Sequence, residues 1–108
     1  MGKQKLETIE QFEQVLAEKQ RFLLIKHSLT CPISRAAFEE YEAFVEDHPE
    51  METYYLFVQE ARPLSNYIAE TSGVKHESPQ ALLFENGAVV WHTSHWNITY
   101  EALTKQAG

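Results

Sequence analysis

The chain alternates between segments whose apolar residues recur at helical spacing and short runs rich in β-forming residues. Predicted helices occupy residues 9–19, 32–47, 63–72 and a C-terminal stretch through about 106, and predicted strands occupy residues 21–26, 52–58, 80–84 and 88–91. The last helix begins after Asn97 or Thr99, because either side chain can cap it. The pattern therefore predicts the element order α-β-α-β-α-β-β-α.

Capping and turn residues stand at the boundaries of these predicted elements. Thr8 followed by Gln11 is the pattern of a capping box at the start of the first helix. Pro32 falls at the first position of the second helix, where a missing N–H costs no hydrogen bond. Gly73 suits the left-handed conformation that ends the third helix, and Asn86-Gly87 is a strong hairpin signal between the last two strands.

This order of elements predicts an α/β fold. Its first half indicates parallel strands joined by a helix, and its second half adds an antiparallel hairpin and a final helix. We therefore expect a mixed four-stranded sheet with helices on both faces. No repeat or linker interrupts the chain, so residues 1–108 are expected to form a single domain.

Composition narrows the classes of partner and the cellular compartment. The net charge of -7 disfavours nucleic acid as a partner. No apolar run approaches the roughly 20 residues of a membrane span, and the charged N-terminus lacks the apolar region of a signal peptide. A single cysteine cannot form an internal disulfide, so we expect a cytoplasmic protein without a membrane partner.

That single cysteine, Cys31, lies at the junction between a predicted strand and a predicted helix. A helix N-terminus offers unpaired N–H groups and the positive end of the helix dipole, and both favour the thiolate. We therefore expect its pKa to lie at least one unit below the free value of about 8.5. Ser34, three residues later, is placed to donate a hydrogen bond to the sulfur. The alternative is an inert cysteine that packs as a small hydrophobic residue.

Other polar and aromatic residues near the predicted strand ends carry weaker signals. Lys26 and His27 point to opposite faces of their strand, so at most one approaches the thiol, and solvated strand-end residues are the alternative. His76 lies in the loop before Pro79 and is a candidate for lining a groove at the site of the thiol. No two histidines have the helical spacing of a zinc site, so no metal is expected. Trp91 and Trp96 are expected to pack in the core or at its edge, and the alternative is that they serve as platforms for a ligand.

The element order, with Cys31-Pro32-Ile33-Ser34 at the start of the second helix, resembles the thioredoxin-like fold. This motif looks like a Cys-x-x-Cys redox site whose second cysteine is replaced by serine, as in monothiol glutaredoxins. Ser78-Pro79 occupies the place of the cis-proline of that fold. With Lys26-His27-Ser28 upstream and Trp96-Asn97-Ile98-Thr99 near the end, the chain resembles the monothiol bacilliredoxins of the YtxJ-like family.

The resemblance implies an activity and a set of site residues. Members of this family act as monothiol thiol–disulfide oxidoreductases that remove bacillithiol from protein mixed disulfides. The implied catalytic residues are Cys31 and Ser34, and the implied substrate-binding residues are Thr30, Pro32, Ile33, Ser78 and Pro79. No bound cofactor is implied. Bacillithiol is the co-substrate, bacillithiolated proteins are the clients, and a separate NADPH-dependent reductase acts on the bacillithiol disulfide.

Departures from related families leave two alternatives open. Thr30 stands where thioredoxins carry an aromatic residue, and Ile25 stands where they carry a buried acid, which disfavours a general dithiol reductase. Pro32 and Ile33 replace the glycine and phenylalanine of cluster-binding monothiol glutaredoxins. One alternative is nevertheless an iron–sulfur carrier, in which Cys31 from two subunits and two small thiols hold a [2Fe–2S] centre. The other is a non-catalytic interaction domain with an incidental thiol.

Overall fold

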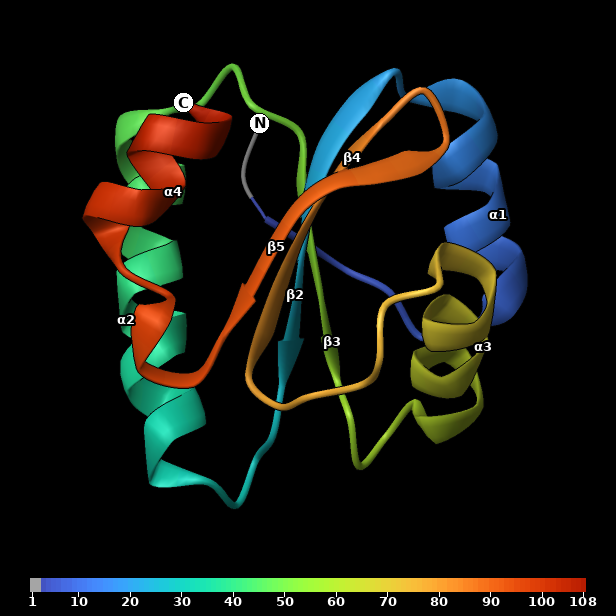
Figure 1. The fold of residues 1–108 in the computed structure, drawn as a ribbon, viewed down its shortest axis with the longest axis horizontal. Coiled ribbons are helices and arrows are strands. Elements are labelled where there is room, and N and C mark those ends of the chain that lie inside the picture. Colours follow the sequence, from blue (N-terminus) through green and yellow to red (C-terminus); the bar gives the residue numbers. More distant parts are fainter. Residues whose placement is uncertain (1–2) are drawn as a thin grey trace.

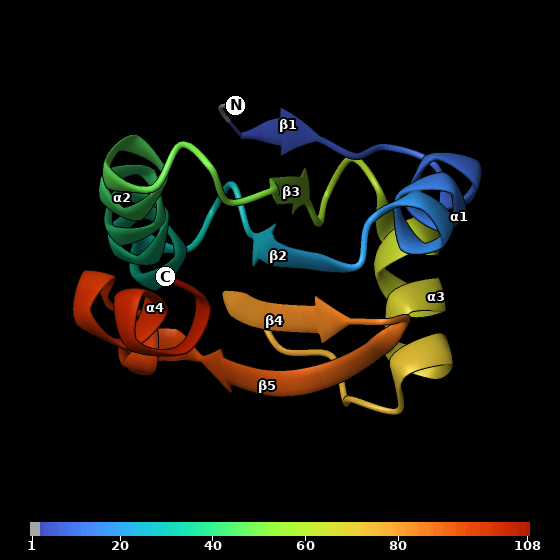
Figure 2. The same cartoon turned by 90° about the horizontal axis from the view of Figure 1, so that it is seen from above.

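A twisted mixed sheet with helices on both faces forms the centre of the computed structural model, which describes residues 3–108. The strands are β1 (Gln4–Lys5), β2 (Arg21–His27), β3 (Thr53–Phe57), β4 (Gln80–Glu85) and β5 (Ala88–Ser94), and the helices are α1 (Ile9–Glu18), α2 (Pro32–Asp47), α3 (Arg62–Ser72), the short 3-10 turn η1 (His95–Asn97) and α4 (Tyr100–Ala107). Helices α2 and α4 cover one face of the sheet, and α1 and α3 cover the other (Figures 1 and 2). Within residues 3–108, no helix combines the length and the apolarity needed to cross a membrane.

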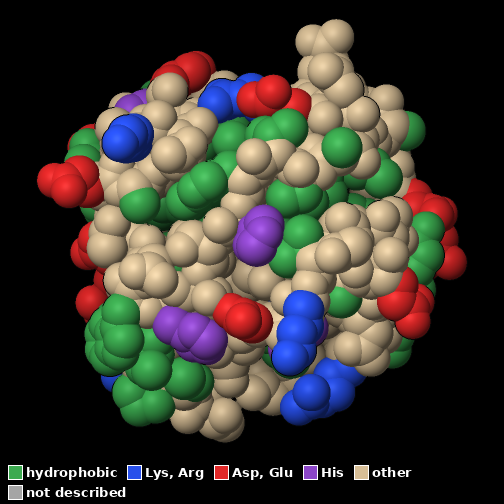
Figure 3. All heavy atoms as spheres, in the orientation of Figure 1, with side chains coloured by type: hydrophobic (Ala, Val, Ile, Leu, Met, Phe, Trp, Pro, Cys, Tyr) green, Lys and Arg blue, Asp and Glu red, His purple; other side chains and the backbone are tan. Residues whose placement is uncertain are grey.

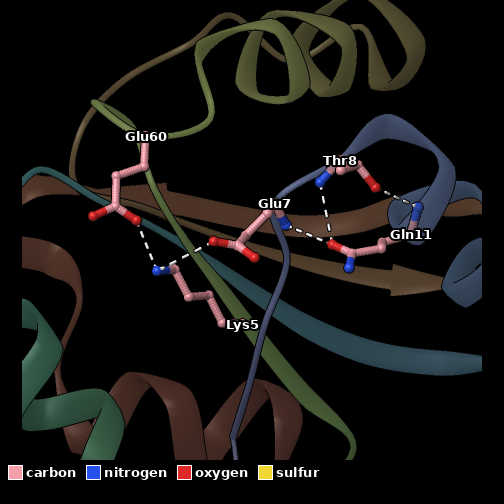
Figure 4. A network of polar contacts seen from close by, with 5 residues as sticks. All are labelled: Lys5, Glu7, Thr8, Gln11 and Glu60. Atoms are coloured by element: carbon pink, nitrogen blue, oxygen red, sulfur yellow. Dashed lines mark hydrogen bonds and ion pairs between the residues drawn. The ribbon is translucent and has the colours of Figure 1, made fainter.

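The strand order is β1-β3-β2-β4-β5, so the prediction of a four-stranded sheet was wrong by one edge strand. β1 pairs in parallel with β3, and the N–H of Leu6 continues the pairing by donating to the carbonyl oxygen of Tyr55 at 2.8 Å. The ammonium of Lys5 lies over the ring of Phe57 and 2.7 Å from the carboxylate of Glu60 (Figure 4). A two-residue strand held by such distant partners has no periodic pattern, which is why the sequence did not indicate it.

The local signals at the element boundaries are confirmed. The hydroxyl of Thr8 accepts a hydrogen bond from the N–H of Gln11, whose side chain in turn accepts from the Thr8 N–H (Figure 4). Gly73 ends α3 at a φ of 74°. Asn86 and Gly87 have φ of 53° and 84°, as a two-residue hairpin requires, and they connect the antiparallel strands β4 and β5.

The segment after the hairpin differs from the prediction at its end. β5 continues to Ser94, three residues beyond the predicted strand, because Gln80 at the start of β4 still has a partner there. The turn η1 follows, and Thr99 rather than Asn97 caps α4, since its hydroxyl accepts from the N–H of Ala102.

β2 is buried on both faces because it is the middle strand. Phe22 and Leu24 pack in the core beneath α1 and α3, whereas Leu23 and Ile25 pack in the core beneath α2 and α4. The strand pairs in parallel with β3 and antiparallel with β4. Its C-terminal end therefore has a strand on each edge and packed side chains on each face. A loop of three residues, 28–30, connects this end to Cys31.

Lys26 is wholly buried. The alternative that its side chain is a solvated residue at the end of a strand was therefore wrong. Its side chain follows the alternation of β2 toward α3, where the ammonium donates to the carbonyl oxygen of Ser65 at 3.0 Å. It also lies 3.3 Å from Nδ1 of His76, and it makes no ion pair with any residue from 3 to 108. Burial without a counter-charge lowers the pKa of Lys26 to about 8.

Replacing Lys26 with methionine should raise the free energy of unfolding at pH 7.5, because it removes a buried cation. The folded protein releases this proton near pH 8 and the unfolded chain near 10.5, so the unfolded state binds more protons between these values. Wild-type stability should therefore rise relative to Lys26→Met by about 2 kcal/mol between pH 7.5 and 9.5. Urea unfolding of both proteins measures this difference.

The matched control is Lys105→Met, which removes an exposed lysine of α4. This variant should keep a constant stability difference from wild type over the same pH range. A constant difference for Lys26→Met as well would contradict the lowered pKa of the buried lysine.

Candidate functional site

Cys31 is the N-cap residue of α2, as the sequence predicted. Its backbone is extended, with φ of -106° and ψ of 121°, and Pro32 opens the helix directly after it. The carbonyl oxygen of Cys31 accepts the N–H of Arg35 at 3.2 Å, which closes the first turn. The thiol therefore stands at the end of α2 where backbone N–H groups have no partner within the helix.

The surroundings of Cys31 lower the pKa of its thiol. The main cause is the backbone N–H of Ser34, with smaller contributions from the backbone N–H of Ile33 and the Ser34 hydroxyl. Partial burial of the cysteine opposes this shift, because it penalises the charged form. The two N–H groups are those that an N-cap side chain normally engages, although the cysteine side chain makes no capping hydrogen bond here.

Ser34 is wholly buried, so its hydroxyl has a fixed environment. The hydroxyl oxygen accepts a hydrogen bond from the backbone N–H of Ser28 at 3.2 Å. Because that bond uses an acceptor site, the O–H proton of Ser34 stays available for the sulfur of Cys31. The side chain thus ties the loop before the cysteine to the helix after it.

Gln59 holds the same loop from outside, and nothing in the sequence pointed to it. Its side-chain oxygen accepts the N–H of Leu29 at 3.0 Å, and its amide donates to the hydroxyl of Ser28 at 2.8 Å. The same amide lies 3.4 Å from the hydroxyl of Thr30. Gln59 comes two residues after β3, so only the parallel pairing of β2 and β3 brings it to this loop.

A groove of about 410 Å³ opens beside the thiol. Its lining residues come from the end of β2, the following loop and one side of α2, and they are His27, Ser28, Leu29, Cys31, Arg35, Phe38, Glu39 and Glu42. His27 therefore lies on the side of the thiol and Lys26 does not, which confirms that only one of them approaches it. Burial lowers the pKa of His27, whose ring packs against Phe38 with centroids 4.7 Å apart.

The Ser78-Pro79 peptide bond is cis, as the resemblance implied. Gln80 pairs with Lys26, so this segment runs beside the strand that leads to the cysteine. Pro79 is buried and Ser78 is half-buried, and neither lines the groove described above. Any contact with a substrate at this segment would therefore be made by Ser78, while Pro79 supports it from beneath.

The other residues implied to contact substrate differ in how accessible they are. Thr30 and Pro32 are exposed, and Ile33 is half-buried. Trp96 is 68% exposed, so the expectation that it packs in or beside the core was wrong. It belongs to η1, which contacts α2 and is tied to the cis-proline segment by the bond from His95 N–H to the Pro79 oxygen at 3.0 Å.

Trp91 behaves as expected, because it packs against the core beneath α2 and α4. No group of three or more histidine, cysteine, aspartate and glutamate side chains within residues 3–108 is placed to hold a metal ion. The chemistry that the arrangement can perform is attack by a thiolate on a disulfide sulfur. With one cysteine in the chain, the resulting mixed disulfide has no internal thiol to resolve it.

Comparison with solved structures agrees with this geometry. A protein described as an oxidoreductase with a thioredoxin fold is 46% identical, with a TM-score of 0.89, over 95% of this chain and 91% of that one. A thioredoxin from Fasciola hepatica has a TM-score of 0.78 at 17% identity, over 96% and 95% of the two chains. Mitochondrial thioredoxin 3 from Saccharomyces cerevisiae has a TM-score of 0.77 at 13% identity, over 96% and 92%. The last two similarities concern the fold alone.

The family model described as monothiol bacilliredoxin BrxC matches residues 4–103. The match includes the cysteine at the start of α2, the cis-proline segment and the final hairpin. Together with the thioredoxin fold, it shows a thiol–disulfide oxidoreductase that belongs to the monothiol bacilliredoxin family.

Proposed function

We propose that this protein removes bacillithiol from protein mixed disulfides, with Cys31 as the nucleophile. The observation that carries the proposal is the single thiol at the N-terminus of α2, whose pKa is lowered by the N–H groups of Ile33 and Ser34. A lowered pKa increases the fraction of thiolate near neutral pH, and the thiolate is the attacking species. Family membership favours bacillithiol as the small thiol.

The first step transfers bacillithiol to the protein. The Cys31 thiolate attacks the bacillithiol sulfur of the mixed disulfide, a new S–S bond forms between them, and the bond to the client breaks. The client sulfur leaves as a thiolate and takes a proton from water. The exchange needs no external oxidant or reductant, because one disulfide bond forms between Cys31 and bacillithiol while the one between bacillithiol and the client breaks.

The second step needs another molecule of bacillithiol, because Ser34 stands where a resolving cysteine would be. A bacillithiol thiolate attacks the bacillithiol sulfur of the Cys31 adduct, bacillithiol disulfide leaves, and the Cys31 thiolate is regenerated. The bacillithiol disulfide is then reduced by a separate NADPH-dependent enzyme in the cytoplasm. No cofactor bound to this chain takes part in either step.

The surrounding residues have distinct roles in this proposal. Ser34 is a positioning residue whose hydroxyl stabilises the thiolate when it forms and when it is regenerated. Exposed Thr30 and Pro32, with half-buried Ile33, contact the client on the side of the helix terminus. Ser78 lies outside the sheet ladder, two residues before β4, and its backbone pairs with an extended segment of the client.

Titration of the ultraviolet absorbance of the thiolate tests the activation of Cys31, since one cysteine gives one signal. The midpoint should lie below 8.5 in the wild type. Ser34→Ala should raise it modestly, because the backbone N–H that causes most of the shift remains. Ser72→Ala, at the far end of α3, should leave the midpoint unchanged. A wild-type midpoint at or above 8.5 would favour the interaction-domain alternative.

A reconstituted reaction tests the two-step cycle. With a bacillithiolated client and no free bacillithiol, we expect about one equivalent of client released per protein and a bacillithiol adduct on Cys31 by mass spectrometry. Added bacillithiol should make the release catalytic. Cys31→Ala should release no client above the rate without protein, and undiminished release by this variant would refute the proposal.

A further inference from the structure

A group of cationic side chains lies beside the cis-proline segment, on the α3 side of the sheet. Lys26 and Arg62 both lower the pKa of His76, after the larger effect of burial, and Lys75 acts on neighbouring Glu77. Blue side chains gather next to a histidine at the lower edge of Figure 3, where the loop between α3 and β4 lies in Figure 1. The concentration is notable because the chain as a whole carries a net charge of -7.

No carboxylate within residues 3–108 forms an ion pair with the exposed cations of this group, although Lys75 lies near enough to Glu77 to lower the pKa of that carboxyl. Neither Arg62 nor Lys75 makes an ion pair with any residue from 3 to 108, although both are exposed. The acidic residue in the loop is Glu77, which is engaged by Ser94 and lies 3.8 Å from Nδ1 of His95. The basic groups are therefore available to an anion from outside.

His76 adds an oriented hydrogen-bond donor to this group. The ammonium of Lys26 can only donate, so Nδ1 of His76 accepts from it at 3.3 Å. The ring is kept neutral by burial and by the nearby cations, and its proton consequently lies on Nε2. That Nε2–H makes no hydrogen bond within residues 3–108. Lys26 and Ser65, which also contacts Nδ1 at 3.2 Å, thus fix the ring of His76.

The backbone places this group next to the proposed docking residue. Loop residue Lys75 is fixed through its carbonyl oxygen, which accepts the side-chain amide of Gln80 at 2.9 Å. Gln80 follows Pro79 and pairs with Lys26 on the strand that leads to Cys31. The groove on the opposite side of the thiol is less suited to an anion, because Glu39 and Glu42 line it with a single arginine.

We propose that Arg62, Lys75 and His76 form a subsite that binds the carboxylates of the small thiol carried on Cys31. This inference rests on the proposed function, and it identifies the part of the small thiol that is recognised. Bacillithiol carries two carboxylates on its malyl group, away from its sulfur, so the residues that bind these carboxylates need not lie at the thiol itself. Cations and N–H donors in fixed positions are what carboxylates require.

The test omits the client, so that acidic residues of a client cannot contribute. Reduced wild type and an Arg62→Gln/Lys75→Gln double variant are each mixed with bacillithiol disulfide or with uncharged 2-hydroxyethyl disulfide. In either reaction the Cys31 thiolate attacks one sulfur, a mixed disulfide forms on Cys31, and the other half leaves as a thiolate. The rate of adduct formation is followed by quenching and mass spectrometry at low and high salt.

The double variant should react about five-fold more slowly with bacillithiol disulfide at low salt, since two exposed charge contacts are lost. Its rate with 2-hydroxyethyl disulfide should equal that of wild type, because the thiolate is unchanged. The difference should shrink at high salt, where exposed charges are screened. Lys105→Gln, which removes a cation on the other face of the sheet, should behave as wild type with both disulfides.

Equal rates for wild type and double variant with bacillithiol disulfide would overturn the subsite, and so would an equal loss with both disulfides. A defect seen only when a bacillithiolated client is present would also overturn it and would assign the cations to the client. Failure of the proposed function would give a different result from failure of the subsite. In that case wild type would release no client from the bacillithiolated protein, whatever the double variant does with the small disulfides.

Discussion

β2 occupies the middle of the sheet, with strands on both edges and helices on both faces, and its last residues lead into the loop that carries the thiol. Every later feature of the site depends on this confinement. Because the strand cannot shift, the turn to α2 begins at a defined place, and Cys31 takes the N-cap position. The loop between them is held by Ser34 from the helix and by Gln59 from the end of β3. A sulfur in this position faces N–H groups that stabilise negative charge.

The two faces of β2 divide the chemistry of the site. His27 faces α2 and lines the groove that contains the thiol, whereas Lys26 faces α3 and lies beneath the loop that precedes the cis-proline. Burial of the Lys26 ammonium without a counter-charge lowers the free energy of unfolding. The same cation also helps to fix the orientation of the His76 ring. The site therefore has a nucleophile on one side and a fixed donor with exposed cations on the other.

The single cysteine determines how a bacilliredoxin differs from the thioredoxins that share its fold. Thioredoxins at 13–17% identity have the same arrangement of helices and sheet, but this similarity concerns the fold alone. Here Ser34 stands at the position of the second cysteine of a Cys-x-x-Cys site, and its side chain is wholly buried. In the cycle that we propose, a small thiol from solution therefore completes the reaction, and the surface around Cys31 recognises that molecule.

Sequence by itself determined the order of the elements and the ends of most of them, because caps and turns such as Thr8 with Gln11 and Asn86-Gly87 are local and carry their own pattern. It also placed Cys31 at a helix N-terminus, and resemblance to a family placed the cis-proline. Only the tertiary structure decided that β1 adds a fifth strand, that Lys26 is buried, that Gln59 holds the loop before the thiol and that Trp96 is exposed. Each of these depends on pairing between segments far apart in the chain, and such pairing leaves no periodicity in the residues themselves.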